Sequence, residues 1–189
     1  MPVPQSVQLF LDTEFTGLHQ QARLISLGLC AESGAAFYAE LAGLDLAALD
    51  PWVGDHVVPQ TRWLSRPGAP REWVQEGELT AGFDAAPGVA RALTDWLGRW
   101  SRVEVWADCL AYDWVLFCEL FGGARALPPQ VFYMPFDLVT LFKVRGLDPD
   151  TDRAAFAGVP GTRPHHALAD ARLTLACYRR LMSLPALSQ

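Results

Sequence analysis

Residues 9–18 are Leu9-Phe10-Leu11-Asp12-Thr13-Glu14-Phe15-Thr16-Gly17-Leu18, an apolar segment that ends in two acids. Side chains two residues apart on a strand share a face, so Asp12 and Glu14 should form a pair. Neighbouring carboxylates repel, and a site made only of oxygen ligands suits Mg²⁺ or Mn²⁺. In the ordinary alternative, Asp12 caps the turn after the strand and Glu14 faces solvent. This segment alone supports both interpretations equally.

A second acidic position lies far downstream, in Pro164-His165-His166-Ala167-Leu168-Ala169-Asp170, where a helical pattern begins. On a helix, His165 and Asp170 stand just over one turn apart, so a carboxylate aimed at a metal brings an imidazole nearby. Such an imidazole can accept a proton from water that metals have made acidic. The alternative is a loop pair of histidines followed by a first-turn acid that the helix dipole stabilises.

Asp113 is the third acidic position, set among large apolar residues in the stretch 106–117. It lies on an expected amphipathic helix that follows a strand near residues 103–106. A single acid there could also be a cap or a surface residue. The three segments taken together, in this order, favour a catalytic metal site.

At this point the sequence resembles the DEDDh 3′→5′ exonucleases, the superfamily that includes ribonuclease T, oligoribonuclease and the proofreading subunits of DNA polymerases. The matching pieces are Asp12-Thr13-Glu14, Tyr112-Asp113 and the segment 165–170, and the resemblance covers about residues 7–181. It is greatest with the small exoribonucleases of mycobacterial type. Many relatives carry His-Asn before the second motif, whereas this chain has Asp108-Cys109, so no nucleotide contact is assigned there.

The resemblance implies two-metal-ion hydrolysis with Mg²⁺, which Mn²⁺ can replace. Asp12 would bridge both ions, Glu14 and Asp170 would bind the ion that holds the attacking water, and Asp113 would support the second ion. His165 would be the general base. The expected enzyme is a 3′→5′ exoribonuclease that releases nucleoside 5′-monophosphates from single-stranded RNA 3′ ends or short oligoribonucleotides.

Candidate substrate-binding residues are Thr13, Phe15, Leu18 and His166. Phe15 and Leu18 match positions that pack against terminal bases in relatives, although a core aromatic is an equally good interpretation of Phe15. The spacing of His166 to Asp170 matches the tyrosine of the sister DEDDy subgroup, and we expect His166 to have a structural role or to contact a phosphate.

Two other functions are considered. A 3′→5′ DNA exonuclease with a proofreading or repair role would share every catalytic residue, and the sequence does not separate it from the RNA enzyme. An inactive nucleic-acid-binding module is disfavoured because all five catalytic positions are present. The resemblance also implies a two-fold symmetric homodimer.

Length and composition fit one domain over residues 1–189, which the resemblance implies is a 3′→5′ exonuclease domain. The chain is 51% hydrophobic with seven Trp and ten Phe, enough for a buried core. Without a signal sequence or a long apolar run, we expect a soluble cytoplasmic enzyme with no membrane partner. Four scattered Cys predict reduced thiols. The net charge is −6, with one Lys and fourteen Arg in no dense run, which excludes a basic tail or a long duplex track.

The hydrophobic pattern predicts an α/β chain with a ribonuclease H-like fold, in which a mixed central sheet carries helices on both sides. Expected strands are 7–12, 22–30, 35–41, 103–107 and 131–134, the first three antiparallel; expected helices are 89–100, 111–121, 137–145 and 166–182. We expect residues 51–82 to form a long ordered connection and residues 148–164 to form a mobile loop that carries His165.

Overall fold

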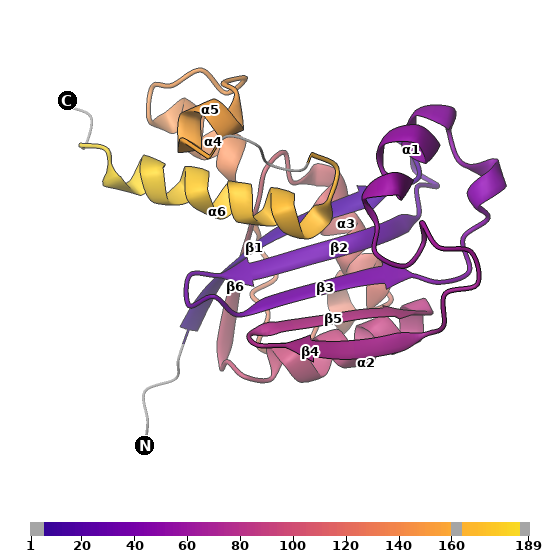
Figure 1. Ribbon diagram of the computed structural model, residues 1–189. Coiled ribbons are helices and arrows are strands. Elements are labelled where there is room, and N and C mark those ends of the chain that lie inside the picture. The colour runs from indigo at the N-terminus through magenta and orange to yellow at the C-terminus, as the bar shows by residue number, and fades with distance from the viewer. Residues whose placement is uncertain (1–5, 160–163, 186–189) are drawn as a thin grey trace.

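A mixed sheet is the centre of the computed structural model, which describes residues 6–159 and 164–185 (Figure 1). Among these residues the strands are β1 (Ser6–Phe15), β2 (Leu24–Ala31), β3 (Ala36–Leu41), β4 (Glu72–Glu76), β5 (Leu79–Asp84), β6 (Arg102–Ala107) and β7 (Phe136–Asp137). Their order across the sheet is β4-β5-β3-β2-β1-β6-β7. The pairs β1–β2 and β2–β3 are antiparallel, as predicted, whereas β1–β6, β3–β5 and β6–β7 are parallel.

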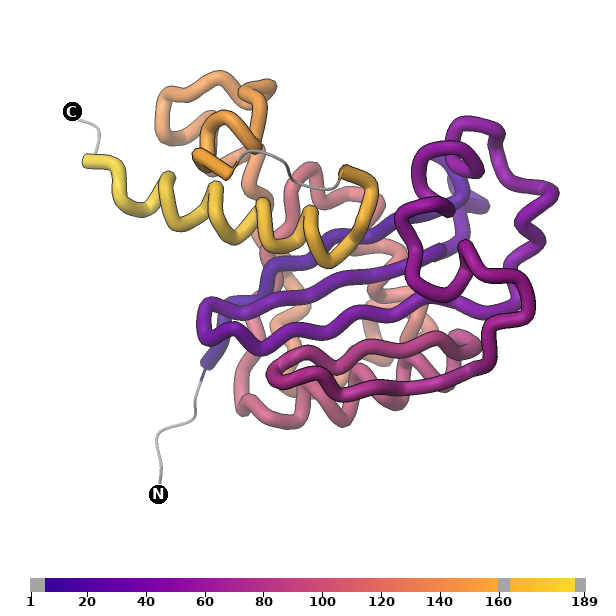
Figure 2. Tube along the Cα trace, in the orientation of Figure 1, coloured from indigo at the N-terminus to yellow at the C-terminus, as the bar shows by residue number. Residues whose placement is uncertain are grey.

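Helices cover both faces of this sheet. They are α1 (Pro51–His56), α2 (Ala86–Leu97), α3 (Ala111–Leu120), α4 (Leu138–Val144), α5 (Arg153–Ala157) and α6 (Ala167–Ser183), with short 3-10 turns at Leu46–Ala48, Val58–Gln60 and Ala124–Ala126. Figure 2 shows α6 lying across one face, with α2 and α3 behind the other. The predicted α/β class and the ribonuclease H-like arrangement of a helix-flanked mixed sheet are confirmed.

Alternation along β1 divides its side chains between two cores. Leu9 and Leu11 pack with residues of α2 and α3, whereas Phe10 packs with residues of α4 and α6. Since side chains two residues apart share a face, Asp12 and Glu14 lie on the side of the sheet that α6 covers. The same alternation places Thr13 on the side of α3.

Gly28 sets how closely α6 approaches the sheet. It lies opposite Asp12 in the β1–β2 register. A Cβ at Gly28 would lie 2.3 Å from the backbone nitrogen of Leu168, so only glycine allows this contact. The first turn of α6 therefore rests directly on β2, beside the acidic end of β1.

Two expectations for the sheet are wrong. The segment 51–82 is more than a connection, because it contains α1, β4 and the start of β5, and β4 and β5 form an antiparallel hairpin. The predicted strand 131–134 is reduced to an isolated bridge between Val131 and Val103, and β7 begins only at Phe136. Pro135 has no backbone N–H to continue a ladder, which explains the break.

The predicted loop 148–164 is also partly helical, because α5 lies within it. Residues 160–163 of that loop lie outside the described residues, and its mobility remains a prediction. Over the described part of the chain, no helix has the length and the apolar character required to cross a membrane.

Candidate active site

Three of the predicted acids meet where β1 ends and α6 begins. Asp12, Glu14 and Asp170 each offer one carboxylate oxygen, and these oxygens all lie within 4.8 Å of one another. The three side chains and His165 line the same cleft, which has a volume of about 1300 Å³. The five salt bridges among the described residues involve other carboxylates. A divalent cation with oxygen ligands fits such a group.

The pKa values of these acids reflect their burial and their mutual repulsion. Burial raises the pKa of Asp12 well above its ordinary value, and the charges of Asp113, Glu14 and Asp170 raise it further. Burial, then Asp170 and Asp113, raise the pKa of Glu14 to about 8. Burial also raises the pKa of Asp170, against the opposing effect of a hydrogen bond from the His166 backbone. Without a cation, the group must therefore hold protons near neutral pH.

Asp113 is buried beside Thr13 and lies outside the group of three acids. Its Oδ1 atom accepts two hydrogen bonds from Thr13, one from the backbone N–H at 2.9 Å and one from the hydroxyl at 2.6 Å. Burial raises the pKa of Asp113 to about 6, although the hydrogen bonds from Thr13 lower it. Thr13 thus orients Asp113. A contact between Thr13 and the substrate remains a prediction.

His165 lies in the cleft with a backbone φ of 60°, a left-handed conformation that few residues other than glycine adopt. Its ring meets the Trp52 ring edge-on, with centroids 4.9 Å apart. Trp52 is the second residue of α1, is 51% exposed and lines the same cleft. We did not predict Trp52 from the sequence; the Asp50-Pro51 pair, a helix-start signal just before it, was the available clue.

His166 has a structural position. Its side chain caps α6 by accepting a hydrogen bond from the backbone N–H of Ala169 at 3.4 Å, and its own backbone N–H donates to Asp170 Oδ2 at 3.1 Å. The imidazole stacks on the Tyr38 ring. These contacts agree with the expected structural role, and a phosphate contact stays a prediction.

The remaining predicted substrate residues line the cleft. Phe15 stacks on Tyr112 with ring centroids 5.4 Å apart and packs against the core, as a core aromatic does, while it also lines the cleft; its packing against a terminal base stays a prediction. Leu18 is 76% exposed, an unusual position for a large apolar side chain. An exposed leucine at the rim of a cleft is available to pack against a ligand.

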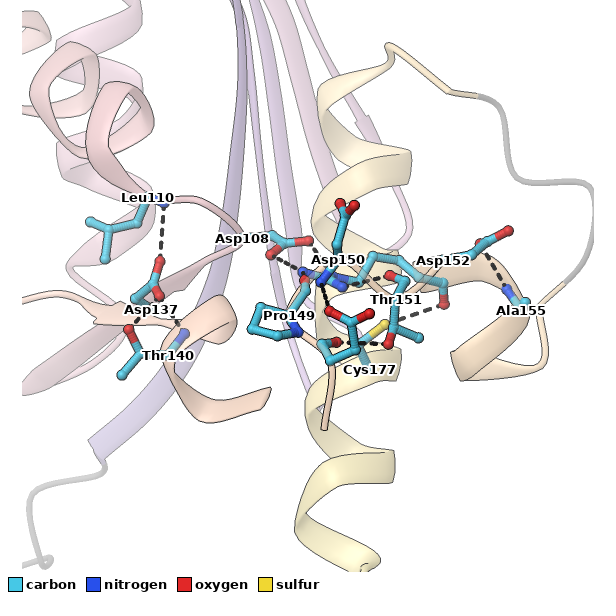
Figure 3. A network of polar contacts seen from close by, with 12 residues as sticks. Asp108, Leu110, Asp137, Thr140, Pro149, Asp150, Thr151, Asp152, Ala155 and Cys177 are labelled. Carbon is cyan, nitrogen blue, oxygen red and sulfur yellow. Dashed lines mark hydrogen bonds and ion pairs between the residues drawn. The ribbon is translucent and has the colours of Figure 1, made fainter. Parts of the chain in front are cut away.

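Asp108, to which the sequence assigned no contact, forms an ion pair with Arg153. Arg153 Nε donates to Asp108 Oδ2 at 2.7 Å, and Nη2 donates to Oδ1 at 3.0 Å. The same guanidinium donates to the carbonyls of Thr151 and Pro149 at 2.6 and 2.9 Å. Figure 3 shows Asp108 beside this segment, with Asp137 bridging Leu110 and Thr140 nearby. The pair fastens the start of α5 to the end of β6 at the wall of the cleft.

Comparison with known proteins agrees with this fold and site. The family described as the 3′-5′ exoribonuclease Rv2179c-like domain matches residues 7–182, and the chain belongs to this family. Two relatives from Mycobacterium tuberculosis strains are the 3′-5′ exoribonuclease Rv2179c of H37Rv and the 3′-5′ exoribonuclease MT2234.1 of CDC 1551. Each is 31% identical over 177 residues, which cover 94% of both chains. The predicted resemblance to small exoribonucleases of mycobacterial type is confirmed.

Proposed function

We propose that this chain is a metal-dependent 3′→5′ exoribonuclease that releases nucleoside 5′-monophosphates from the 3′ ends of single-stranded RNA or from short oligoribonucleotides. The observation that carries the proposal is the group of Asp12, Glu14 and Asp170 in one cleft with His165. Membership in a family described as 3′-5′ exoribonuclease supports the direction and the substrate class.

The acids would hold two Mg²⁺ ions, and Mn²⁺ would substitute for them. The donor set fits because it contains only carboxylate oxygens, and the pKa of Glu14, raised by burial and by the charges of Asp170 and Asp113, supports a site that a cation would stabilise. Asp12, Glu14 and Asp170 would be direct ligands, and Asp113, oriented by Thr13, would support the second ion. When bound, the ions stabilise the developing charge on the phosphate and lower the pKa of the attacking water.

The remaining chemistry comes from the side chains of the cleft. His165 accepts a proton from the attacking water, a role that requires a neutral imidazole within reach of that water. Phe15 and Leu18 supply apolar surface for bases, and packing of this kind tolerates any base sequence, as an exonuclease that removes successive nucleotides requires. Thr13 and His166 remain candidates for contacts with the terminal nucleotide.

We also propose that the enzyme works as a homodimer in the cytoplasm. Among the described residues that line the cleft, Arg23 and Arg153 are the arginines, and Arg153 is already paired with Asp108. A second subunit could add the positive charge that a longer RNA strand needs. Cys30, Cys118 and Cys177 are buried free thiols, which suits a reducing compartment. Light scattering that finds a fully active monomer at micromolar concentration would exclude the dimer.

A time course on labelled oligonucleotides tests the activity. RNA and DNA single strands of equal sequence, labelled at the 3′ or the 5′ end, are incubated with Mg²⁺, Mn²⁺, Ca²⁺ or EDTA. We expect stepwise shortening of RNA from its 3′ end with Mg²⁺ and Mn²⁺, little turnover with Ca²⁺, and none with Asp12→Asn. Cleavage of DNA without cleavage of RNA would replace the proposal by the DNA exonuclease, and substantial activity of Asp12→Asn would refute the metal site.

A further inference from the structure

Tyr38, in the middle of β3, is a rigid platform beneath the start of α6. The residue is 3% exposed, and its hydroxyl donates to Glu40 Oε1 at 2.8 Å. Glu40 is fully buried and also accepts backbone N–H bonds from Trp63 and Leu64 at 2.9 and 2.8 Å. The phenol is therefore anchored to a carboxylate that is itself fixed by the backbone, and the ring has little freedom to move.

His166 lies flat on this platform. The imidazole and the Tyr38 ring have centroids 4.6 Å apart and planes 16° apart. The cap on the Ala169 N–H and the bond from the His166 backbone to Asp170 fix the same residue at two further points. The side chain and the backbone of His166 are both held, so the direction in which the chain enters α6 is set.

His165, the preceding residue, needs such support. Its φ of 60° is left-handed, which is unfavourable for a residue with a Cβ, and such a conformation persists only where the surroundings enforce it. Trp52 meets the His165 imidazole edge-on, a contact with the side chain of His165. The fixed residue 166 constrains the peptide next to His165, together with a hydrogen bond from the His165 backbone to Asp170.

We infer that Tyr38 is a positioning residue for His165, acting through the stacked ring of His166. The inference rests on the proposed role of His165 as general base. If the platform is lost, His165 can relax toward an ordinary backbone conformation and its imidazole leaves the position that the reaction requires. Asp12 and Glu14 lie on β1, which pairs with β2 and β6 and not with the strand that carries Tyr38. The expected result is a lower kcat, with the KM for RNA nearly unchanged.

Two substitutions at residue 38 separate the ring from the hydroxyl. Tyr38→Phe keeps the stacked ring and should retain kcat within a few-fold. Tyr38→Leu removes the ring and should lower kcat by between about 10-fold and 10²-fold, the range expected when a reacting group is displaced by about 1 Å. Because Tyr38→Leu opens a core position, His166→Asn serves as a second variant: asparagine can still cap the helix but cannot stack. It should reproduce the loss in kcat, and a rise in KM alone would show a substrate contact instead.

The decisive measurement repeats Tyr38→Leu in a His165→Ala background, with RNA and Mg²⁺. If Tyr38 acts through His165, the second substitution should cause no further loss of rate, whereas a general structural defect would lower the rate equally in both backgrounds and would overturn the inference. Urea unfolding of each variant verifies that the folded fraction is the same during the assay. A wild-type rate for His165→Ala would instead refute the general base itself, and the positioning role with it.

Discussion

Removal of the Arg153 guanidinium should destabilise the fold more than removal of any exposed arginine. Arg153→Met keeps a long apolar side chain over the Phe142 ring, where the guanidinium carbon now lies 4.3 Å from the centroid. It removes both hydrogen bonds to Asp108 and the two to backbone carbonyls. It also leaves the Asp108 carboxylate unpaired near Asp12, whose pKa Asp108 already raises.

The size of the effect follows from the exposure of the pair. Breaking a fully buried ion pair by removing one partner costs about 3–5 kcal/mol. The side chains of Arg153 and Asp108 are 17% and 23% exposed, so water can partly solvate the remaining charge. We therefore expect a loss of about 2–3 kcal/mol in the free energy of unfolding, between the buried and the exposed limits.

Urea unfolding in EDTA measures this difference, with Arg179→Met as the matched control. Arg179 Nε donates to Glu32 at 3.1 Å, but the two side chains are 52% and 54% exposed, and the control should lose less than about 1 kcal/mol. The double variant Asp108→Asn, Arg153→Met should recover part of the loss because no unpaired charge remains. Equal losses for Arg153→Met and Arg179→Met would refute the argument from burial.

Three further predictions concern the acids and their supports. Thr13→Val removes a hydroxyl donor and should raise the pKa of Asp113 above about 6, which carbon-detected NMR titration of the carboxyl can measure; an unchanged value would show that the hydrogen bond is not formed. Gly28→Ala places a methyl group against α6 and should weaken Mn²⁺ binding in calorimetry, whereas Gly54→Ala, which meets no atom within 4 Å, should leave it unchanged; equal effects would contradict the close contact. In EDTA, folded Glu14 keeps its proton up to pH about 8, whereas in the unfolded chain it ionises near its ordinary pKa of about 4.3. The folded state thus binds more protons between these values, and stability should fall as pH rises across this window. In urea unfolding, Glu14→Gln should reduce the difference between the free energies of unfolding at pH 5 and at pH 8.5. An unchanged difference would show that Glu14 is not the titrating group.

Much of the candidate site was predictable because its signals are local. The two-residue spacing of Asp12 and Glu14 and the start of a helix before Asp170 fix where these side chains point once the elements form. The resemblance to the DEDDh exonucleases then indicated that these acids belong to one site. The acids come together because Gly28 lets α6 lie directly on β2. No local sequence pattern shows that a glycine within a strand allows such a close helix contact.

The missed features are contacts between segments that are far apart in sequence. The sequence around Asp108 does not predict its ion pair with Arg153. The sequence around Tyr38 likewise does not predict its stacking on His166, because both contacts depend on the completed topology. The β4–β5 hairpin was missed because β4 is an exposed-edge strand with charged residues at both ends, Glu72 and Glu76, which lowers its hydrophobic signal. The buried residues of this hairpin lie on β5.

The assembly of the acidic group from the first strand and the last helix has a consequence for protein synthesis. A ribosome makes β1 well before α6, so a nascent chain carries Asp12 and Glu14 long before Asp170 can join them. Until α6 has emerged and docked on Gly28, the growing polypeptide lacks one ligand of the proposed metal site. A nascent chain of this enzyme would thus stay inactive until α6 has docked, and any chain released before residue 170 would be harmless to the transcripts around it.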